Sequence, residues 1–134
     1  MVAVDTNVLV RLLTGDDPHQ TAAARRLLHA GPVWIAKMVL LETSWVLRSV
    51  YGFEESAIRD AFSKLLGLKN VQAEDDSCVA AALALTQHGI EFADAMHLSS
   101  RPPGAVFVSF DRSFVRHAKR AAVAGVSDAG APRP

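Results

Sequence analysis

The chain has 134 residues, of which 50% are hydrophobic and 21% are charged, and its formal net charge at pH 7 is zero. This length and composition indicate one globular domain and exclude a disordered chain, which would carry too few apolar residues to form a core. No apolar run approaches the roughly 20 residues that a membrane-spanning helix needs, so no membrane association is expected.

The cysteine content and the first residues bear on the compartment. Cys78 is the single cysteine, which excludes an internal disulfide and a zinc site built from several cysteines. Residues 1–5 lack the basic leader and the long apolar stretch of a signal peptide. We therefore expect a cytoplasmic protein.

Short apolar runs alternate with longer amphipathic segments along the chain. Strands are expected at residues 2–4, 33–35, around 71, at 105–108 and, at an edge, at 123–126. Helices are expected at about residues 6–13, 17–30, 38–50, 54–66, 76–88, 92–100 and 114–121. This order predicts an α/β fold in which a short-stranded, mainly parallel central sheet, with its first strand buried, is covered by helices on both faces. Residues 1–126 are expected to form the domain, and residues 127–134 a flexible tail.

Two aspartates follow predicted strands. Asp5 comes directly after the first strand, and Asp111 lies just beyond the strand that ends near residue 108. Ligands of parallel α/β sheets collect outside the carboxyl ends of the strands, so both acids are candidates for one site. Each of them is also explained by itself as the N-cap of the helix that follows.

Glu42 interrupts an otherwise apolar helix. Its neighbours three and four residues away include Met38, Val39, Trp45 and Val46. A carboxylate buried among them would cost several kcal/mol unless it were paired or bound to a metal. We therefore expect Glu42 to belong to a functional site. The alternative is that it faces solvent or pairs with a nearby cation, Lys37 or Arg48.

Asp94 lies near the start of a predicted helix and is flanked by small residues, Ala93 and Ala95. Small neighbours would let a metal ion or a phosphate approach closely. The other interpretation is an acid in the first turn that complements the helix dipole.

Together the four carboxylates predict a metal site more strongly than each does separately. Placed in one crevice, they would repel one another unless a cation compensated their charge. They offer oxygen ligands and no cysteine or histidine cluster, which selects Mg²⁺ or Mn²⁺. Water bound to such an ion can attack a phosphodiester in line, which predicts nuclease chemistry.

The C-terminal third is basic although the whole chain is neutral. Residues 101–134 carry six basic residues against two acidic ones. Four of the basic residues are candidates for RNA contacts: Arg112, Arg116, Lys119 and Arg120. Taken alone, these residues are better explained as an ordinary solvated helix face.

Four segments resemble, in order, the acidic motifs of PIN-domain proteins. They are Val-Ala-Val-Asp5-Thr6-Asn7-Val-Leu-Val-Arg11, Leu-Leu-Glu42-Thr-Ser-Trp-Val-Leu, Phe-Ala-Asp94-Ala-Met-His-Leu and Ser109-Phe-Asp111-Arg112-Ser-Phe114. The resemblance covers residues 1 to about 120, and the nearest group is the VapC toxins of toxin–antitoxin operons, which are ribonucleases held inactive by a cognate antitoxin.

The resemblance implies a three-layer α/β/α sandwich, dependence on Mg²⁺ or Mn²⁺, an RNA substrate, an antitoxin partner and a homodimer. It implies that Asp5, Glu42, Asp94 and Asp111 form the metal site, that the hydroxyls of Thr6 and Ser109 support it, and that Asn7 orders the loop around Asp5. The short segment after Val123 departs from the family's usual ending, so its last strand is expected to be weak or differently placed.

Two other functions are compatible with the sequence. One is a PIN-like module that binds RNA or a protein without cleaving. The other is a phosphatase or phosphoacceptor domain in which Asp5 carries the phosphoryl group. Phosphatases of this class place a second aspartate two residues after the first, and this chain has Asn7 there.

Overall fold

The computed structural model describes residues 1–131, in which helices and short strands alternate as the sequence predicts. The strands are β1 (Val2–Ala3), β2 (Val33–Ile35), β3 (Val71–Ala73), β4 (Phe107–Ser109) and β5 (Val126–Asp128). The helices are α1 (Thr6–Thr14), α2 (Pro18–Ala30), α3 (Lys37–Ser49), α4 (Glu55–Leu66), α5 (Asp76–Thr86), α6 (Phe92–Ser99) and α7 (Arg112–Arg120). The predicted α/β class is confirmed, since all paired strands are short and parallel.

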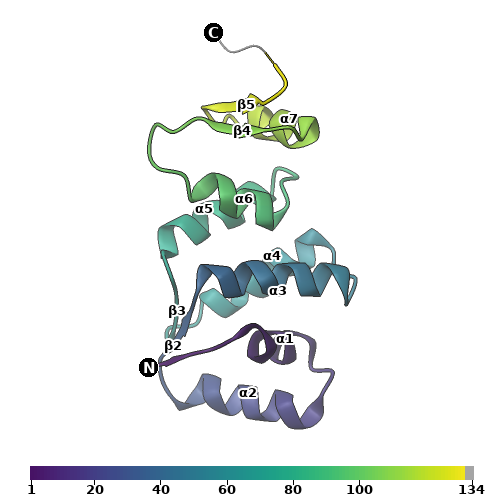
Figure 1. Cartoon of the computed structure of the whole chain (residues 1–134). Helices are drawn as coiled ribbons and strands as arrows, with labels where there is room; N and C mark the ends of the chain where they lie inside the picture. The colour runs from purple at the N-terminus through teal and green to yellow at the C-terminus, as the bar shows by residue number, and fades with distance from the viewer. Residues whose placement is uncertain (132–134) are drawn as a thin grey trace.

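The strands form two sheets and not the one central sheet that was expected. One sheet has the order β1-β2-β3, and the other pairs β4 with β5. In Figure 1 the β4–α7–β5 unit lies at one end of the molecule and the three-stranded sheet lies toward the other, with α5 and α6 between them. The expectation failed because strand pairing depends on contacts between distant residues, which local patterns do not encode.

Strand β1 is an exposed edge, which corrects the expectation of a buried strand. Val2 and Ala3 are both exposed, whereas Val33 and Ile35 of β2 are buried. Strand β2 is central because it pairs with β1 on one side and β3 on the other, while β1 has a partner on one side only.

The C-terminal strand lies later than predicted. It was expected to end at residue 126, but β5 spans Val126–Asp128, so it includes two residues that were assigned to a flexible tail. The remainder of that tail lies partly outside the described residues. Within residues 1–131, no helix is long and apolar enough to cross a membrane.

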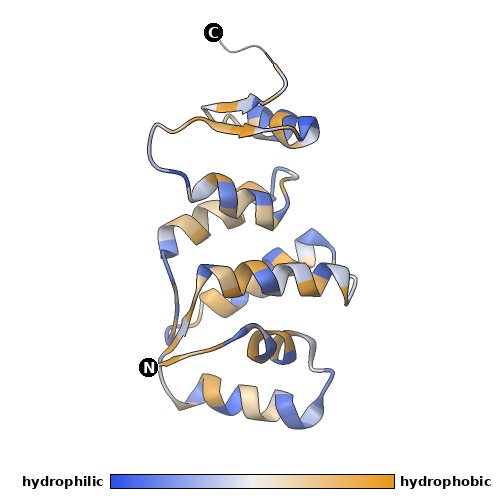
Figure 2. Cartoon of the chain, in the orientation of Figure 1, coloured by the Kyte–Doolittle hydropathy of each residue, from blue (hydrophilic) through white to orange (hydrophobic). Residues whose placement is uncertain are grey.

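The core forms where the apolar faces of the helices meet, as the alternation of apolar and polar residues along each helix in Figure 2 illustrates. Ile58 and Phe62 are fully buried on α4, where their spacing of four residues places them on one face. The ring of Phe62 meets that of Phe92 edge to face, with centroids 5.0 Å apart. This contact fixes the first residue of α6 against α4.

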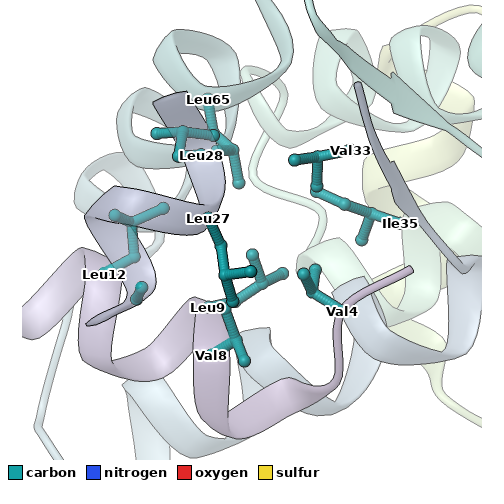
Figure 3. Close-up of a pocket in the computed structure, with 10 residues that line it drawn as sticks. Val4, Val8, Leu9, Leu12, Leu27, Leu28, Val33, Ile35 and Leu65 are labelled. Atoms are coloured by element: carbon teal, nitrogen blue, oxygen red, sulfur yellow. The ribbon is translucent and has the colours of Figure 1, made fainter. Parts of the chain in front are cut away.

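A small apolar cavity lies between α1, α2 and the β1–β2 edge of the sheet. The side chains drawn in Figure 3, among them Val4, Leu9, Leu27 and Ile35, converge on it, and no polar atom lines it. Its volume is about 10 Å³. A space of this size holds no organic ligand, so it belongs to the core packing and not to a binding site.

Candidate active site

Asp5 and Glu42 lie on the same cavity. Asp5 is the N-cap of α1, where its carboxylate accepts a hydrogen bond of 3.1 Å from the Val8 N–H. The cavity has a volume of about 360 Å³ and is also lined by Thr6 and Asn7. Asp5 can therefore be both the N-cap of α1 and an acid of the site, because capping uses one carboxylate oxygen and leaves the other free.

Glu42 is exposed, and the expectation that it is buried was wrong. Met38 and Trp45, four residues before it and three after it, are themselves 80% and 57% exposed, so this face of α3 is turned to solvent. The core side of α3 carries Leu40, Thr43 and Leu47 instead. Because this carboxylate is exposed, its desolvation penalty is small. Burial therefore gives no reason to assign Glu42 to a functional site.

Asp94 and Asp111 line a second cavity, with a volume of about 150 Å³. Asp94 lies half-buried in the first turn of α6. Asp111 is the N-cap of α7, accepting a hydrogen bond of 3.0 Å from the Phe114 N–H, and its own N–H donates to the Ser109 hydroxyl at 3.0 Å. Ser109 thus orders the loop that presents Asp111.

The pKa of Asp94 is raised above its ordinary value. Burial is the main cause, followed by repulsion from the carboxylates of Glu91 and Asp111, while His97 and Arg48 oppose the shift. This cavity therefore brings together acidic groups whose full ionisation is disfavoured unless positive charge is added.

The two pairs of acids do not converge on one point. Among residues 1–131, no three histidine, cysteine or acidic side chains are close enough together to hold a metal ion. Glu42 lies between the pairs, because it also lines a groove of about 470 Å³ together with Ala93 and His97 of α6. The structure thus joins Asp5 with Glu42 and Asp94 with Asp111, but not all four.

Arg48 and Glu91 are site residues that the sequence did not reveal. The Arg48 guanidinium contacts Glu91 at 2.5 Å and Glu55 at 3.4 Å, and Glu55 also accepts a hydrogen bond of 3.3 Å from the Phe92 N–H. Neither predicted partner cation reaches Glu42, since Lys37 instead pairs with Asp75. The sequence gives one indication of these site residues, because Glu91 is an acid three residues before Asp94 at the start of a helix.

The predicted basic residues lie on α7, beside Asp111. Arg116, Lys119 and Arg120 are exposed there, and Arg112 lies 3.6 Å from Asp128 of β5. His117 of the same helix is half-buried, and its Nδ1 lies 2.7 Å from the Ser113 carbonyl oxygen. A cationic surface therefore adjoins the cavity of Asp94 and Asp111.

Comparison with known proteins identifies one family. The PIN domain family matches residues 2–120, a range that contains all four acids. Helices and short parallel strands fit the three-layer α/β/α fold of that family. No curated protein matches the chain.

Proposed function

The chain belongs to the PIN-domain family, and on that premise we propose that it is an endoribonuclease whose activity depends on Mg²⁺ or Mn²⁺. The observation that carries the proposal is the pairing of Asp94 with Asp111 in one cavity, where the pKa of Asp94 is raised by burial and by neighbouring acids. Such a cluster is suited to a cation and not to a neutral ligand.

The donor chemistry fits Mg²⁺ or Mn²⁺, because both ions prefer carboxylate oxygens. The arrangement within one chain does not fit a single ion held by Asp5, Glu42, Asp94 and Asp111, because these acids are divided between two cavities. An ion bound to these acids would supply activation of water and neutralisation of charge on a phosphodiester.

The proposed substrate is RNA. The exposed cations Arg116, Lys119 and Arg120 lie on the helix that Asp111 caps, so a phosphate backbone held on α7 would lie close to the acids. Arg112 is less available, because Asp128 lies beside it. The hydroxyls of Thr6 and Ser109 and the amide of Asn7 are proposed to support Asp5 and Asp111 from adjoining positions.

The resemblance of the four acidic segments to VapC toxins supports a narrower proposal. The chain would act in the cytoplasm as the toxin of a toxin–antitoxin pair, as a homodimer that a cognate antitoxin holds inactive. The test is genetic: expression of the chain alone should arrest growth, and co-expression of a small protein encoded beside it should relieve the arrest. Growth unaffected by the chain would contradict the toxin assignment and leave the nuclease assignment standing.

The nuclease assignment is tested with purified protein and a structured RNA. Cleavage should require Mg²⁺ or Mn²⁺, stop in EDTA, and fall by about 100-fold or more in Asp5→Asn and in Asp94→Asn. Asparagine also caps a helix, so the first substitution preserves α1. Asp60→Asn is the matched control, because Asp60 is exposed on α4, away from both cavities. Cleavage that persists in EDTA or in both site variants would overturn the proposal.

The separation of the two acid pairs favours one second candidate, a PIN module that binds RNA without cleaving it. Calorimetry with Mn²⁺ discriminates between the two functions. Saturable binding that Asp94→Asn abolishes supports the nuclease, whereas RNA binding with no Mn²⁺ binding and no cleavage supports the second candidate.

A further inference from the structure

One face of α3 is apolar and turned to solvent. Met38, Leu41 and Trp45 follow one another at spacings of three and four residues, which places them on the same side of the helix. Met38 is 80% exposed and Trp45 is 57% exposed. The indole of Trp45 is a large, flat and rigid surface, and its burial against a ligand would be favourable. An exposed apolar patch of this kind indicates a binding surface.

This face forms one wall of the groove of about 470 Å³. Helix α6 packs against α3 and supplies the other wall with Ala93 and His97, which lie four residues apart on one side of α6. The side chain of Ala93 is a single methyl group, so α6 leaves space in the groove. The volume is in the range of about 300–1,000 Å³ that small-molecule sites have, and it suits one nucleotide.

The groove is continuous with the cavity of Asp5. Met38 and Glu42 line both spaces. Trp45 lies three residues beyond Glu42, which corresponds to about 4.5 Å along the helix axis. A nucleotide whose phosphate is held at Asp5 and Glu42 through a cation can therefore extend its base into the groove beside Trp45.

The charges that line the groove favour a neutral group over a phosphate. They are the carboxylates of Glu42 and Glu55 and the guanidinium of Arg48. The positive charge of Arg48 is already compensated, because it pairs with Glu55 and Glu91. A phosphate in the groove would be repelled by these carboxylates, whereas the exposed cations of α7 attract it. A nucleobase is neutral, and its amino group can donate to a carboxylate such as that of Glu42.

We propose that the groove between α3 and α6 is a base-binding subsite, in which a nucleobase next to the scissile phosphodiester stacks on the indole of Trp45. The inference rests on the proposed function for the position of the phosphodiester. It assigns the contacts with bases to α3 and the contacts with phosphates to α7. Every base has a flat face that can stack, and purines should stack more strongly than pyrimidines because their rings are larger.

Fluorescence of Trp45 tests the subsite without any measurement of activity. The chain has two tryptophans, Trp34 and Trp45, so Trp34→Phe leaves Trp45 as the single reporter. This variant is titrated with pentaadenylate in Ca²⁺, which binds carboxylate oxygens as Mg²⁺ does. Gel electrophoresis verifies that the oligonucleotide stays intact. The emission of Trp45 should be quenched in proportion to binding, which the anisotropy of fluorescein-labelled pentaadenylate measures separately. Pentauridylate should quench less.

Matched variants separate stacking from other effects on binding. Trp45→Phe retains Trp34, which is half-buried in β2, and the emission of Trp34 should not change with RNA. In the otherwise unsubstituted chain, Trp45→Ala should weaken binding by at least about fivefold, because it removes the stacking surface. Val50→Ala, at a 66% exposed apolar position at the C-terminal end of α3, is the control and should leave binding unchanged.

A cation of α7 distinguishes the base contacts from the phosphate contacts. Arg116→Gln, in the Trp34→Phe chain, should weaken binding of pentaadenylate, because Arg116 is exposed on α7 and is proposed to hold phosphate. The quenching of Trp45 at saturation should stay the same, since the groove is intact. Far-UV circular dichroism verifies that each variant is folded.

The possible outcomes separate the subsite from the proposed function. No binding of pentaadenylate, binding without quenching, or equal binding by the parent and Trp45→Ala overturns the subsite. An emission of Trp45 that shifts with protein concentration and not with RNA means that a second copy covers the groove, which also overturns it. Quenching by RNA that the parent does not cleave in Mg²⁺ contradicts the nuclease and leaves the subsite standing. Cleavage without quenching has the opposite meaning.

Discussion

Arg48 and Glu91 form an ion pair of 2.5 Å that joins α3 to the N-cap residue of α6. Glu55 of α4 lies 3.4 Å from the same guanidinium and accepts a hydrogen bond from the first residue of α6. Three helices are thus tied together one turn before Asp94, so this network sets the position and the charge environment of that carboxyl.

Substitution of Arg48 should therefore change the ionisation of Asp94. Arg48 opposes the upward shift of the Asp94 pKa, so Arg48→Gln is expected to raise that pKa further and to reduce RNA cleavage at neutral pH. The pKa is measured by NMR titration of the Asp94 carboxyl in metal-free buffer. Arg25→Gln, at an exposed position on α2, is the control and should leave the titration unchanged.

The stability of the protein should depend on pH through Asp94. Its pKa is higher in the folded than in the unfolded state, so between the two pKa values the folded state binds more protons. The free energy of unfolding should fall as pH rises through this range, and Asp94→Asn should remove that fall. Urea unfolding of the parent protein and of Asp94→Asn from pH 3 to 8 measures the free energy of unfolding of each. Equal pH profiles would mean that Asp94 is not desolvated in solution.

Asp111 has a capping role that can be separated from its proposed role in the site. Its carboxylate caps α7 through the Phe114 N–H. Asp111→Asn retains a good cap and should leave the stability close to that of the parent, whereas Asp111→Ala should cost about 1 kcal/mol. Both variants should lose RNA cleavage. If Asp111→Asn retains cleavage, the acid does not act in the site.

Gly89 and Gly52 offer a matched pair of substitutions. Both have a positive φ, +82° and +71°, but a Cβ at Gly89 would meet the His117 ring, whereas a Cβ at Gly52 meets nothing within 4 Å. Gly52→Ala should cost about 1–2 kcal/mol from the backbone alone. Gly89→Ala should cost more, and the excess should disappear in a His117→Ala background. Thermal unfolding of Gly52→Ala, Gly89→Ala, His117→Ala and the double variant Gly89→Ala/His117→Ala measures these differences.

The hydrogen bond between Tyr51 and Asp16 allows a second test of local electrostatics. The Tyr51 hydroxyl donates to Asp16 at 2.6 Å and is the main cause that lowers the pKa of that carboxyl, with Thr14 and Arg11 adding to it. Tyr51→Phe should raise the Asp16 pKa. The stabilisation from Asp16, present above its unfolded pKa, would then be lost at a higher pH during acidification. NMR titration of Asp16 provides the measurement.

The local features of the fold could be predicted from the sequence, because they depend on neighbouring residues. The caps Asp5 and Asp111 and the proline at the first position of α2 mark helix starts correctly. Apolar spacing likewise identifies the buried face of α4.

The features that could not be predicted from the sequence depend on which segments meet in space. Glu42 appeared buried because its neighbours are apolar, yet Met38 and Trp45 turn to solvent with it. The Arg48–Glu91 pair joins segments that are distant in sequence, so the position of Glu91 near Asp94 does not reveal Arg48 as its partner. The edge positions of β1 and β4 could not be anticipated either, since the residue pattern of a strand does not determine which strand it pairs with.

The β4–α7–β5 unit is continuous in sequence, from residue 107 to 128, and this has a consequence for synthesis on the ribosome. Strand β1 cannot pair until β2 and the two helices between them have emerged, so β1 waits longer for its partner than β4 waits for β5. The C-terminal unit, by contrast, makes its own strand pair within a short stretch of chain. It can therefore form its strand pair as soon as residues 107–128 have left the exit tunnel.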